Sequence, residues 1–414
     1  MRKRVVAAFL VLAMCLALLP STVLAADSDF RIFEGKLSGY TGPGGHVTIP
    51  DGVTEIEYQA FMDRTNLTGV TIPRGVTYIG KEAFKGCTGL KSVVIPDSVT
   101  RIAEGAFRGC ESLSDLTIGK SVTKIEAWTF KGCKSLTGVT VPNGVISIGE
   151  GAFSRTRLTS VSIPNSVTSI GKSAFSDTRL TSVSIPNSVT SIGESAFLRT
   201  SLTDVSIPNS VTDMGLLAFG HCYDLTNMVI PGSVTEIRSD TFQNCANLSS
   251  VIISEGVTGI GCNAFWGCTG LTSIVIPDSV TSIGDSAFMY CSNFTVYGSA
   301  GSMIEQYCKE NEIPFVEIPK PGTVRSGTLI GAGDKRLAWD ITAEGKVTVD
   351  TAKLAPEEKV LVGCYGDAGR FTGVRLLDAS NATARIDPKT PNVRLFWLNG
   401  VQAPLSPSVT VWGR

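Results

Sequence analysis

The chain has 414 residues, of which 43% are apolar and 18% are charged, and its 36 Lys and Arg nearly balance its 37 Asp and Glu. This length exceeds one ordinary domain and predicts at least two units or an array of repeats. The composition excludes a disordered polar chain, and the near-neutral charge lacks the basic field that nucleic-acid binding requires. Eleven cysteines are many for this length and need a structural explanation.

Residues 1–25 have the order of a secretory signal peptide. Three basic residues at positions 2–4 precede an apolar run over residues 5–19, and a small-residue cleavage site lies at Ala25 or Ala26. Removal of this segment takes the net charge from −1 to −4, because three basic and no acidic residues leave with it. No later stretch reaches the roughly 18 apolar residues of a spanning helix. We therefore expect a secreted, extracellular protein, with any attachment to the cell surface noncovalent.

A repeat of 22–23 residues dominates residues 47–294. Each turn contains a valine, an isoleucine (once Met214) three residues later, and a phenylalanine eight residues later. The valines are Val53, Val76, Val99, Val122, Val145, Val167, Val189, Val211, Val234, Val257 and Val280. The phenylalanines are Phe61, Phe84, Phe107, Phe130, Phe153, Phe175, Phe197, Phe219, Phe242, Phe265 and Phe288. Eleven matching turns predict a solenoid in which each turn buries its apolar side chains only against its neighbours.

Residues 158–175 show the local structure that one turn is expected to have. Leu158, Val161 and Ile163 alternate with serines and predict a short strand with its apolar side chains pointing inward. Pro164 ends that strand, and a second extended segment follows. The piece before the phenylalanine has room only for one helical or 3₁₀ turn. At a strand spacing of roughly 4.8 Å, the whole array forms an arc on the order of 50 Å long.

The strand pattern L-x-x-V-x-I-P and the tail A-F-x-x-C closely resemble the BspA-like class of bacterial leucine-rich repeats. The resemblance covers about residues 30–318 and includes lead-in and exit segments at 33–45 and 296–315. It implies a β-rich leucine-rich-repeat solenoid of eleven turns with short 3₁₀ or helical pieces. Members of this class are typically secreted or surface binding proteins, some of them adhesins for host matrix proteins or other bacteria.

The chain is expected to divide into six segments. They are a signal peptide at 1–25, an N-terminal cap at 26–46, the repeats at 47–294, a C-terminal cap at 295–318, a Pro-Lys-Pro-Gly linker at 319–322 and a second domain at 323–414.

Short strand-like runs predict that the second domain is small, all-β and sandwich-like. The runs are Leu337–Ile341, Lys346–Val349, Val360–Tyr365, Val374–Leu377, Ala382–Ile386, Val393–Leu398 and Val409–Trp412. Residues 360–373 and 396–405 also resemble, more loosely, a C-terminal module of secreted Firmicutes proteins. Four aromatic residues fit either the core, which is the commoner place at strand spacing, or a sugar-stacking platform. They are Trp339, Phe396, Trp397 and Trp412.

Seven cysteines lie eleven residues after their valine and therefore share one column of the solenoid. They are Cys87, Cys110, Cys133, Cys222, Cys245, Cys268 and Cys291. Export favours disulfides, but a bond along the stack needs side-chain directions that a parallel repeat does not supply, so we favour buried free thiols. No CxxC motif or recurring histidine supports a zinc site. Cys262, Cys308 and Cys364 lie outside the column and are the candidates for reactive thiols.

No residue set in the sequence nominates a catalytic, cofactor or metal site. Of the two histidines, His46 lies in the entry cap, and His221 beside Cys222 is not placed to act as its base. No nucleophile elbow, zinc-protease, P-loop or dinucleotide motif is present in a credible context. Glu150, Lys172 and Glu194 alternate in sign on successive turns, which indicates a solvated charge ladder. We therefore expect a protein that is not an enzyme and has no cofactor.

An outward-facing column lies two residues after each valine. It reads Glu55, Tyr78, Arg101, Lys124, Ser147, Ser169, Ser191, Asp213, Glu236, Gly259 and Ser282. Its N-terminal turns carry aromatic and cationic side chains that can anchor a protein partner, whereas serines offer little area to bury. Tyr78, Arg101 and Lys124 are thus the candidate partner-binding residues. The alternative is a generic hydroxyl-rich sheet face without a ligand.

The leading functional prediction is a secreted or cell-surface scaffold that binds a macromolecule through the sheet face of the solenoid, with a protein of the host matrix or of a bacterial surface favoured. The competing prediction is a structural or cell-envelope component that binds glycan through residues 323–414, with the solenoid as a spacer. Neither includes a nucleic-acid partner or a membrane span.

Overall fold

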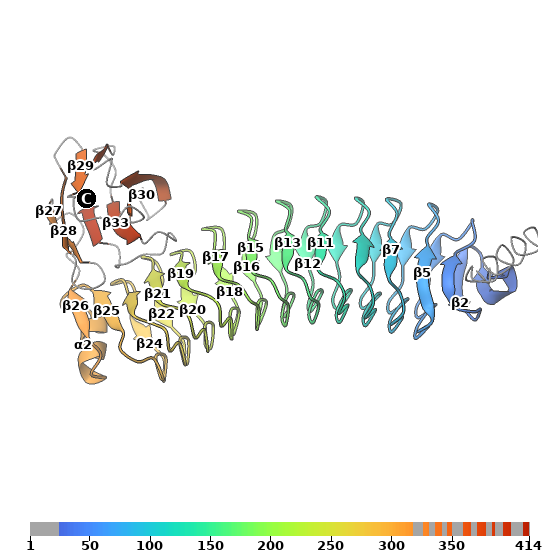
Figure 1. Cartoon of the computed structure of the whole chain (residues 1–414), viewed down its shortest axis with the longest axis horizontal. Coiled ribbons are helices and arrows are strands. Elements are labelled where there is room, and N and C mark those ends of the chain that lie inside the picture. The colour runs from blue at the N-terminus through green and yellow to red at the C-terminus, as the bar shows by residue number, and fades with distance from the viewer. Residues whose placement is uncertain are drawn as a thin grey trace, which may run out of the picture.

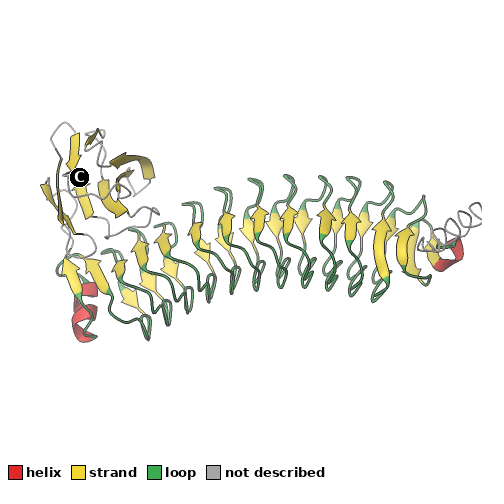
Figure 2. Cartoon of the chain, in the orientation of Figure 1, coloured by secondary structure: helices red, strands yellow, loops and turns green. Residues whose placement is uncertain are grey.

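The computed structural model describes residues 25–317 and, beyond them, the backbone of eight strands between residues 326 and 413. Within 30–317 the chain coils into a long, gently curved rod in which strands of successive turns lie side by side (Figure 1). Each turn contributes one longer and one two-residue strand, joined by turns and loops (Figure 2). The predicted solenoid is therefore confirmed.

The short strands form one long sheet and one short sheet. The first has the order β1-β2-β4-β6-β8-β10-β12-β14-β16-β18, and the second β20-β22-β24. The bounds are β1 Phe30–Phe33, β2 Lys36–Tyr40, β4 Glu55–Ile56, β6 Tyr78–Ile79, β8 Arg101–Ile102, β10 Lys124–Ile125, β12 Ser147–Ile148, β14 Ser169–Ile170, β16 Ser191–Ile192, β18 Asp213–Met214, β20 Glu236–Ile237, β22 Gly259–Ile260 and β24 Ser282–Ile283. All pairs are parallel except β1 with β2.

The longer strands form three parallel sheets, β3-β5-β7-β9, β11-β13-β15-β17 and β19-β21-β23-β25-β26. The bounds are β3 Gly45–Thr48, β5 Leu67–Thr71, β7 Ser92–Val94, β9 Asp115–Thr117, β11 Gly138–Thr140, β13 Ser160–Ser162, β15 Ser182–Ser184, β17 Asp204–Ser206, β19 Asn227–Ile230, β21 Ser250–Ile253, β23 Ser273–Val275, β25 Thr295–Gly298 and β26 Phe315–Glu317. The middle sheet contains the strands that follow one another at 22 residues, as Gly138 and Ser160 do. The sheet breaks therefore fall where the repeat changes between 22 and 23 residues.

The turn at 158–175 confirms the expected alternation and corrects one detail. Leu158, Val161 and Ile163 are at most 9% exposed, whereas the serines between them face solvent. The expected helical or 3₁₀ piece before Phe175 is instead a series of turns. The reason is Ser173, whose φ of 52° places it in the left-handed region and prevents a continuous right-handed helix.

The phenylalanines form one continuous stack through the rod. From Phe61 to Phe288 each ring centroid lies 4.8–5.7 Å from the next, with ring planes within 1–12° of parallel. All of these side chains are at most 6% exposed. Ten such steps give a core of about 50 Å, as a stack at strand spacing should.

Both ends of the core are covered by non-repeat structure. At the start, the antiparallel pair β1 and β2 follows a short 3₁₀ helix, η1 Asp27–Asp29, and Tyr40 stacks 5.2 Å from Phe61. At the end, helix α2 Met303–Glu310 begins at the N-cap Ser302 and buries Ile304 and Cys308 against the core. These elements shield the apolar ends that a repeat array leaves open.

The C-terminal strands form two antiparallel sheets, β27-β28-β29-β32 and β31-β30-β33-β34. Their bounds are β27 Ser326–Ile330, β28 Arg336–Ile341, β29 Lys346–Val349, β30 Lys359–Tyr365, β31 Phe371–Leu377, β32 Thr383–Arg385, β33 Asn392–Leu398 and β34 Val409–Gly413. The described backbone of this segment consists of strands, and β27 is a strand that the sequence pattern did not indicate. Residues 1–24, with the predicted signal peptide, and the side chains of Trp339, Phe396, Trp397 and Trp412 lie outside the described part of the structure.

Candidate binding surfaces

The three predicted partner-binding residues lie on successive strands of the short-strand sheet. Tyr78 on β6 pairs in register with Arg101 on β8, and Lys124 occupies the equivalent position on β10. Each is followed by an isoleucine that is at most 1% exposed, so period-two alternation points the three side chains away from the core. We call the outward surface of this sheet the short-strand face.

Arg101 lies against its neighbours while remaining open to solvent. Its guanidinium carbon is 5.8 Å from the centroid of the Tyr78 ring, within the range of a cation–π contact. Its Nε lies 3.8 Å from Oε1 of Glu126, and the Arg101 side chain is still 65% exposed. The pair thus presents an aromatic surface and a cation that keeps most of its accessible area.

Lys124 is an exposed cation beside this pair. Among the residues that the structure describes, it makes no ion pair, whereas Lys81 and Lys172 each lie 2.9 Å from a glutamate of the following turn. Beyond Lys124 the face continues as Ser147 and Ser169, which are short and half-buried. The short-strand face therefore carries long side chains at its N-terminal turns and short hydroxyls in its middle, and charged side chains return at Asp213 and Glu236.

The Lys172–Glu194 pair confirms one step of the predicted charge ladder. Both side chains are about half exposed, at 52% and 43%. The hydrogen bond to Glu194 raises the pKa of Lys172. Solvated pairs of this kind add little to stability, and they neutralise the middle of the rod.

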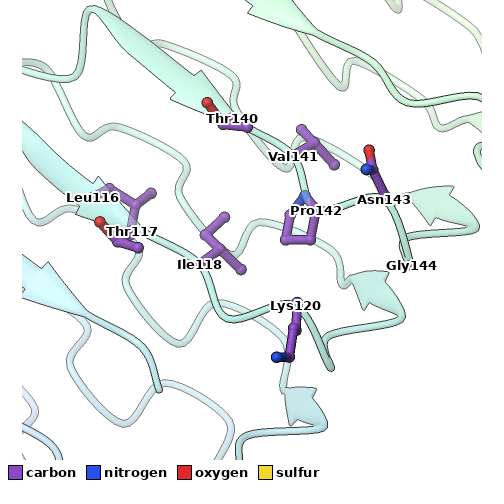
Figure 3. A pocket seen from close by; sticks show the side chains of 9 residues that line it. All are labelled: Leu116, Thr117, Ile118, Lys120, Thr140, Val141, Pro142, Asn143 and Gly144. Atoms are coloured by element: carbon purple, nitrogen blue, oxygen red, sulfur yellow. The ribbon is translucent and has the colours of Figure 1, made fainter. Parts of the chain in front are cut away.

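A hollow opens between the two turns at residues 116–120 and 140–144 (Figure 3). Its volume is about 540 Å³. The lining side chains come from the ends of β9 and β11 and the turns after them, and they are Leu116, Thr117, Ile118, Lys120, Thr140, Val141, Pro142, Asn143 and Gly144. The hollow sits where the first long-strand sheet ends and the middle one begins, since β9 and β11 belong to different sheets.

Gly119, in the turn beside the hollow, stands where neighbouring turns carry proline. A Cβ at this position would clash with the carbonyl oxygen of Pro96, so the backbone here packs tightly against the preceding turn. Lys120 also contacts the preceding turn. Its backbone N–H donates to Oδ1 of Asp97 at 2.9 Å, and its Nζ lies 3.2 Å from Oδ2 of the same residue.

The hollow offers apolar contact and no acid–base chemistry. Its lining is mainly aliphatic, and Lys120 is its one ionisable side chain. That lysine is already paired with Asp97. The sequence prediction missed this hollow.

The cysteine column consists of buried thiols, as predicted. Six of the seven are fully buried, and each thiol donates to the carbonyl of the phenylalanine in the preceding turn, as Cys87 does to Phe61 at 3.0 Å. Burial raises the pKa of Cys87 and of Cys133 to about 12. In the three 22-residue turns, a threonine such as Thr178 takes this place and donates to the carbonyl of the phenylalanine of its own turn. The column thus satisfies a backbone acceptor in each of these turns, and burial protects its six fully buried thiols from reagents.

The three cysteines outside the column differ from one another. Cys262 is exposed and can react. Cys308 is 1% exposed in α2, and burial raises its pKa to about 11, so the expectation that it is reactive is wrong. The sequence did not show that α2 turns this residue toward the core. Cys364 lies on β30, whose side chains are outside the described residues.

The histidines hold structural positions. Nδ1 of His221 lies 3.0 Å from the hydroxyl of Tyr223, and the thiol of Cys222 donates to Phe197, so the two neighbours do not form a base–nucleophile pair. Burial lowers the pKa of His221. Nε2 of His46 lies 2.8 Å from the hydroxyl of Thr71. Over the described ranges there is no cluster of three potential metal ligands and no helix long and apolar enough to cross a membrane.

Parallel stacked turns, an aliphatic and phenylalanine core and solvent-facing polar strands define this protein as a leucine-rich-repeat scaffold. The family model for the "BspA type Leucine rich repeat region" matches residues 54–181 and 168–295, with six copies of the repeat. The chain belongs to this family.

Two solved structures illustrate the relationship. A leucine-rich repeat protein from Bacteroides ovatus is 27% identical, covers 69% of this chain over 87% of its own length, and superposes with a TM-score of 0.55. A leucine rich cell surface protein from Faecalibacterium prausnitzii is 31% identical and covers 70% of this chain over 97% of its own length, with a TM-score of 0.43. No curated protein matches the chain.

Proposed function

We propose that this protein is an extracellular or surface-associated scaffold that binds a protein partner through the N-terminal part of its short-strand face. The observation that carries the proposal is the arrangement of Tyr78, Arg101 and Lys124 on three adjacent strands. The rigid solenoid fixes the backbone spacing of these side chains before any partner arrives. Such pre-organisation lowers the entropic cost of binding.

The residue types support a protein ligand. Tyrosine and arginine are enriched among the residues that dominate protein–protein binding energy, and both bury large areas in one contact. The cation–π contact between Arg101 and Tyr78 also limits the conformations that Arg101 samples before binding. A flat hydroxyl face, as at Ser147 and Ser169, has no comparable anchor.

Export of the chain is part of the same proposal. Membership of a family that includes a named cell-surface protein supports a location outside the cell. The apolar run at residues 5–19, preceded by basic residues, supports secretion by a cleaved signal. Sequencing the N-terminus of the exported protein tests this point, because we expect it to start at Ala26 or Asp27.

The experiment that tests the function compares two classes of ligand. The full chain is passed over immobilised purified extracellular matrix proteins and, separately, over isolated bacterial cell walls. Saturable binding to a matrix protein supports the proposal. Binding to cell walls alone contradicts it and favours the glycan-binding alternative in residues 323–414.

A further inference from the structure

The outward surface of the longer strands, here called the long-strand face, changes character along the rod. One row of outward side chains runs along this face, and within each of the three sheets its members pair in register. It reads Thr48, Thr71, Val94, Thr117, Thr140, Ser162, Ser184, Ser206, Val229, Ile252, Val275, Tyr297 and Val316. The row is dominated by hydroxyls up to β17 and becomes apolar from β19, the first strand of the last sheet. We call Val229, Ile252, Val275, Tyr297 and Val316 the apolar strip.

The middle of the apolar strip is buried although its side chains point out of the solenoid. Ile252 is 2% exposed and Val275 is 8% exposed. Ser250, which also points outward on β21, is 4% exposed, whereas its equivalents Ser160 and Ser182 face solvent. All four residues of β21 are buried, unlike those of any strand in the middle sheet.

Flanking side chains do not account for this burial. Val94 is an outward β-branched residue in the same row, and it lies between Thr71 and Thr117. It is nevertheless 62% exposed. Ile252 therefore needs a cover that lies above the sheet, and not only neighbours within it.

No segment between β23 and residue 317 supplies this cover. Strands β25 and β26 extend the sheet sideways, and α2 directs Ile304 and Cys308 into the core at the end of the rod. The burial also arises within a single chain. The remaining part of the chain starts at the edge of this same sheet, because β26 ends at Glu317. From that edge to β21 is a span of three strand spacings, about 14 Å, which a linker of a few residues can bridge.

We propose that the apolar strip is the docking surface for the chain's own C-terminal β domain, residues 323–414. The domain covers Ile252 and Val275, and the two ends of the strip, Val229 and Val316, lie at the edge of the contact. The exposures fit such a footprint, since Val229 is 53% and Val316 is 41% exposed. Burial also raises the pKa of Tyr297, which lies between the covered residues and the margin. Oδ1 of Asn227, in the adjacent outward row on β19, is shielded from solvent without a partner among the described residues.

Docking has a consequence for how the molecule is built. A domain joined to the rod only by a flexible linker would move independently of it. A docked domain is instead held at the C-terminal end of the rod. The N-terminal part of the short-strand face is then left unobstructed. Domains that share a sizeable apolar contact move as one body, and those without it do not.

The test uses the full chain and the double substitution Ile252→Asp and Val275→Asp. Small-angle scattering gives the radius of gyration, and trypsin reports access to the segment between the domains, where it can cut after Arg325. The matched control is Val94→Asp, an outward β-branched residue of the same row that is already exposed. Circular dichroism establishes that each variant keeps its strands.

We expect the double variant to have a larger radius of gyration and to be cut after Arg325 at least about tenfold faster, because cleavage follows the population of the open state. Val94→Asp should match the wild type. If the aspartates unfold the solenoid, Ile252→Ser with Val275→Ser restores the residue type found at Ser184 and Ser206 and should give the same, smaller changes. A folded variant with unchanged scattering and cleavage would overturn the proposal, as would a dimeric mass for the wild type that the substitutions reduce to a monomer.

Discussion

Truncation of one ring in the phenylalanine stack should destabilise the rod more than any surface change. Phe175 is fully buried, and its ring lies 5.6 Å from that of Phe153 and 5.5 Å from that of Phe197, nearly parallel to both. Phe→Ala substitutions in cores cost about 3–5 kcal/mol, and each lost aromatic pair adds about 0.5–1.5 kcal/mol beyond area. The measured cost of a Phe→Ala substitution already includes part of the energy of the aromatic pairs, so the two terms do not add fully. We therefore expect Phe175→Ala to cost about 5 kcal/mol.

The assay is equilibrium unfolding in urea, followed by circular dichroism of the β signal. Ser169→Ala, on the outward face of the same turn, is the control and should change the free energy of unfolding by less than about 0.5 kcal/mol. A repeat array is held together by nearest-neighbour contacts, so the weakened turn should also divide the transition into two steps. The stacking account is refuted if Phe175→Ala costs less than about 1 kcal/mol and keeps one transition.

Three further predictions concern the cysteine column and the hollow. In the folded protein at pH 8, thiol reagents should label Cys262 promptly and Cys133 only after denaturation; prompt labelling of Cys133 would contradict its burial. Because the pKa of Cys133 is about 12 in the folded protein and near 9 when unfolded, its contribution to stability is complete below pH 9 and is lost as the pH rises toward 12. Urea midpoints measured between pH 7 and 11 should therefore fall above pH 9, and a flat profile in that range would count against this reasoning. Gly119→Ala should cost about 1–3 kcal/mol by overpacking against Pro96, whereas Gly138→Ala, whose added Cβ meets nothing within 4 Å, should be within about 1 kcal/mol of wild type. Equal effects of the two substitutions in the same urea assay would refute the tight packing of Gly119 on Pro96.

The sequence predicted the solenoid because one set of residues recurs with a nearly fixed period. Val167 and Phe175 need a stacked neighbour to be buried, and that need leaves few architectures open. The alternation from Leu158 to Ile163 likewise determined which side chains point inward, and the structure confirms it. Local detail was less predictable, because the left-handed conformation of Ser173 follows from bonds to the next turn.

Features that depend on contacts between distant segments were missed. The hollow lies between β9 and β11, which belong to different sheets, and the repeat pattern alone does not express that break. Ile252 points out of the solenoid and is nevertheless buried, and the isoleucine alone gave no sign of this burial. The burial of Cys308 follows from the orientation of α2, whose single apolar face is visible in the sequence only once the helix is placed. The roles of Tyr78, Arg101 and Lys124 stay a prediction.

The most direct test of the central claim uses a matrix protein that the full chain binds. One variant carries Tyr78→Ser, Arg101→Ser and Lys124→Ser, which extends the serine surface of the middle turns to the N-terminal turns. The matched control carries Ala at positions 147, 169 and 191 of the same face. We expect the first variant to raise Kd by at least about tenfold, equivalent to 1.4 kcal/mol, and the control to leave it unchanged. Equal Kd values for the first variant and the wild type, with both folded, would contradict the claim that this face binds the partner.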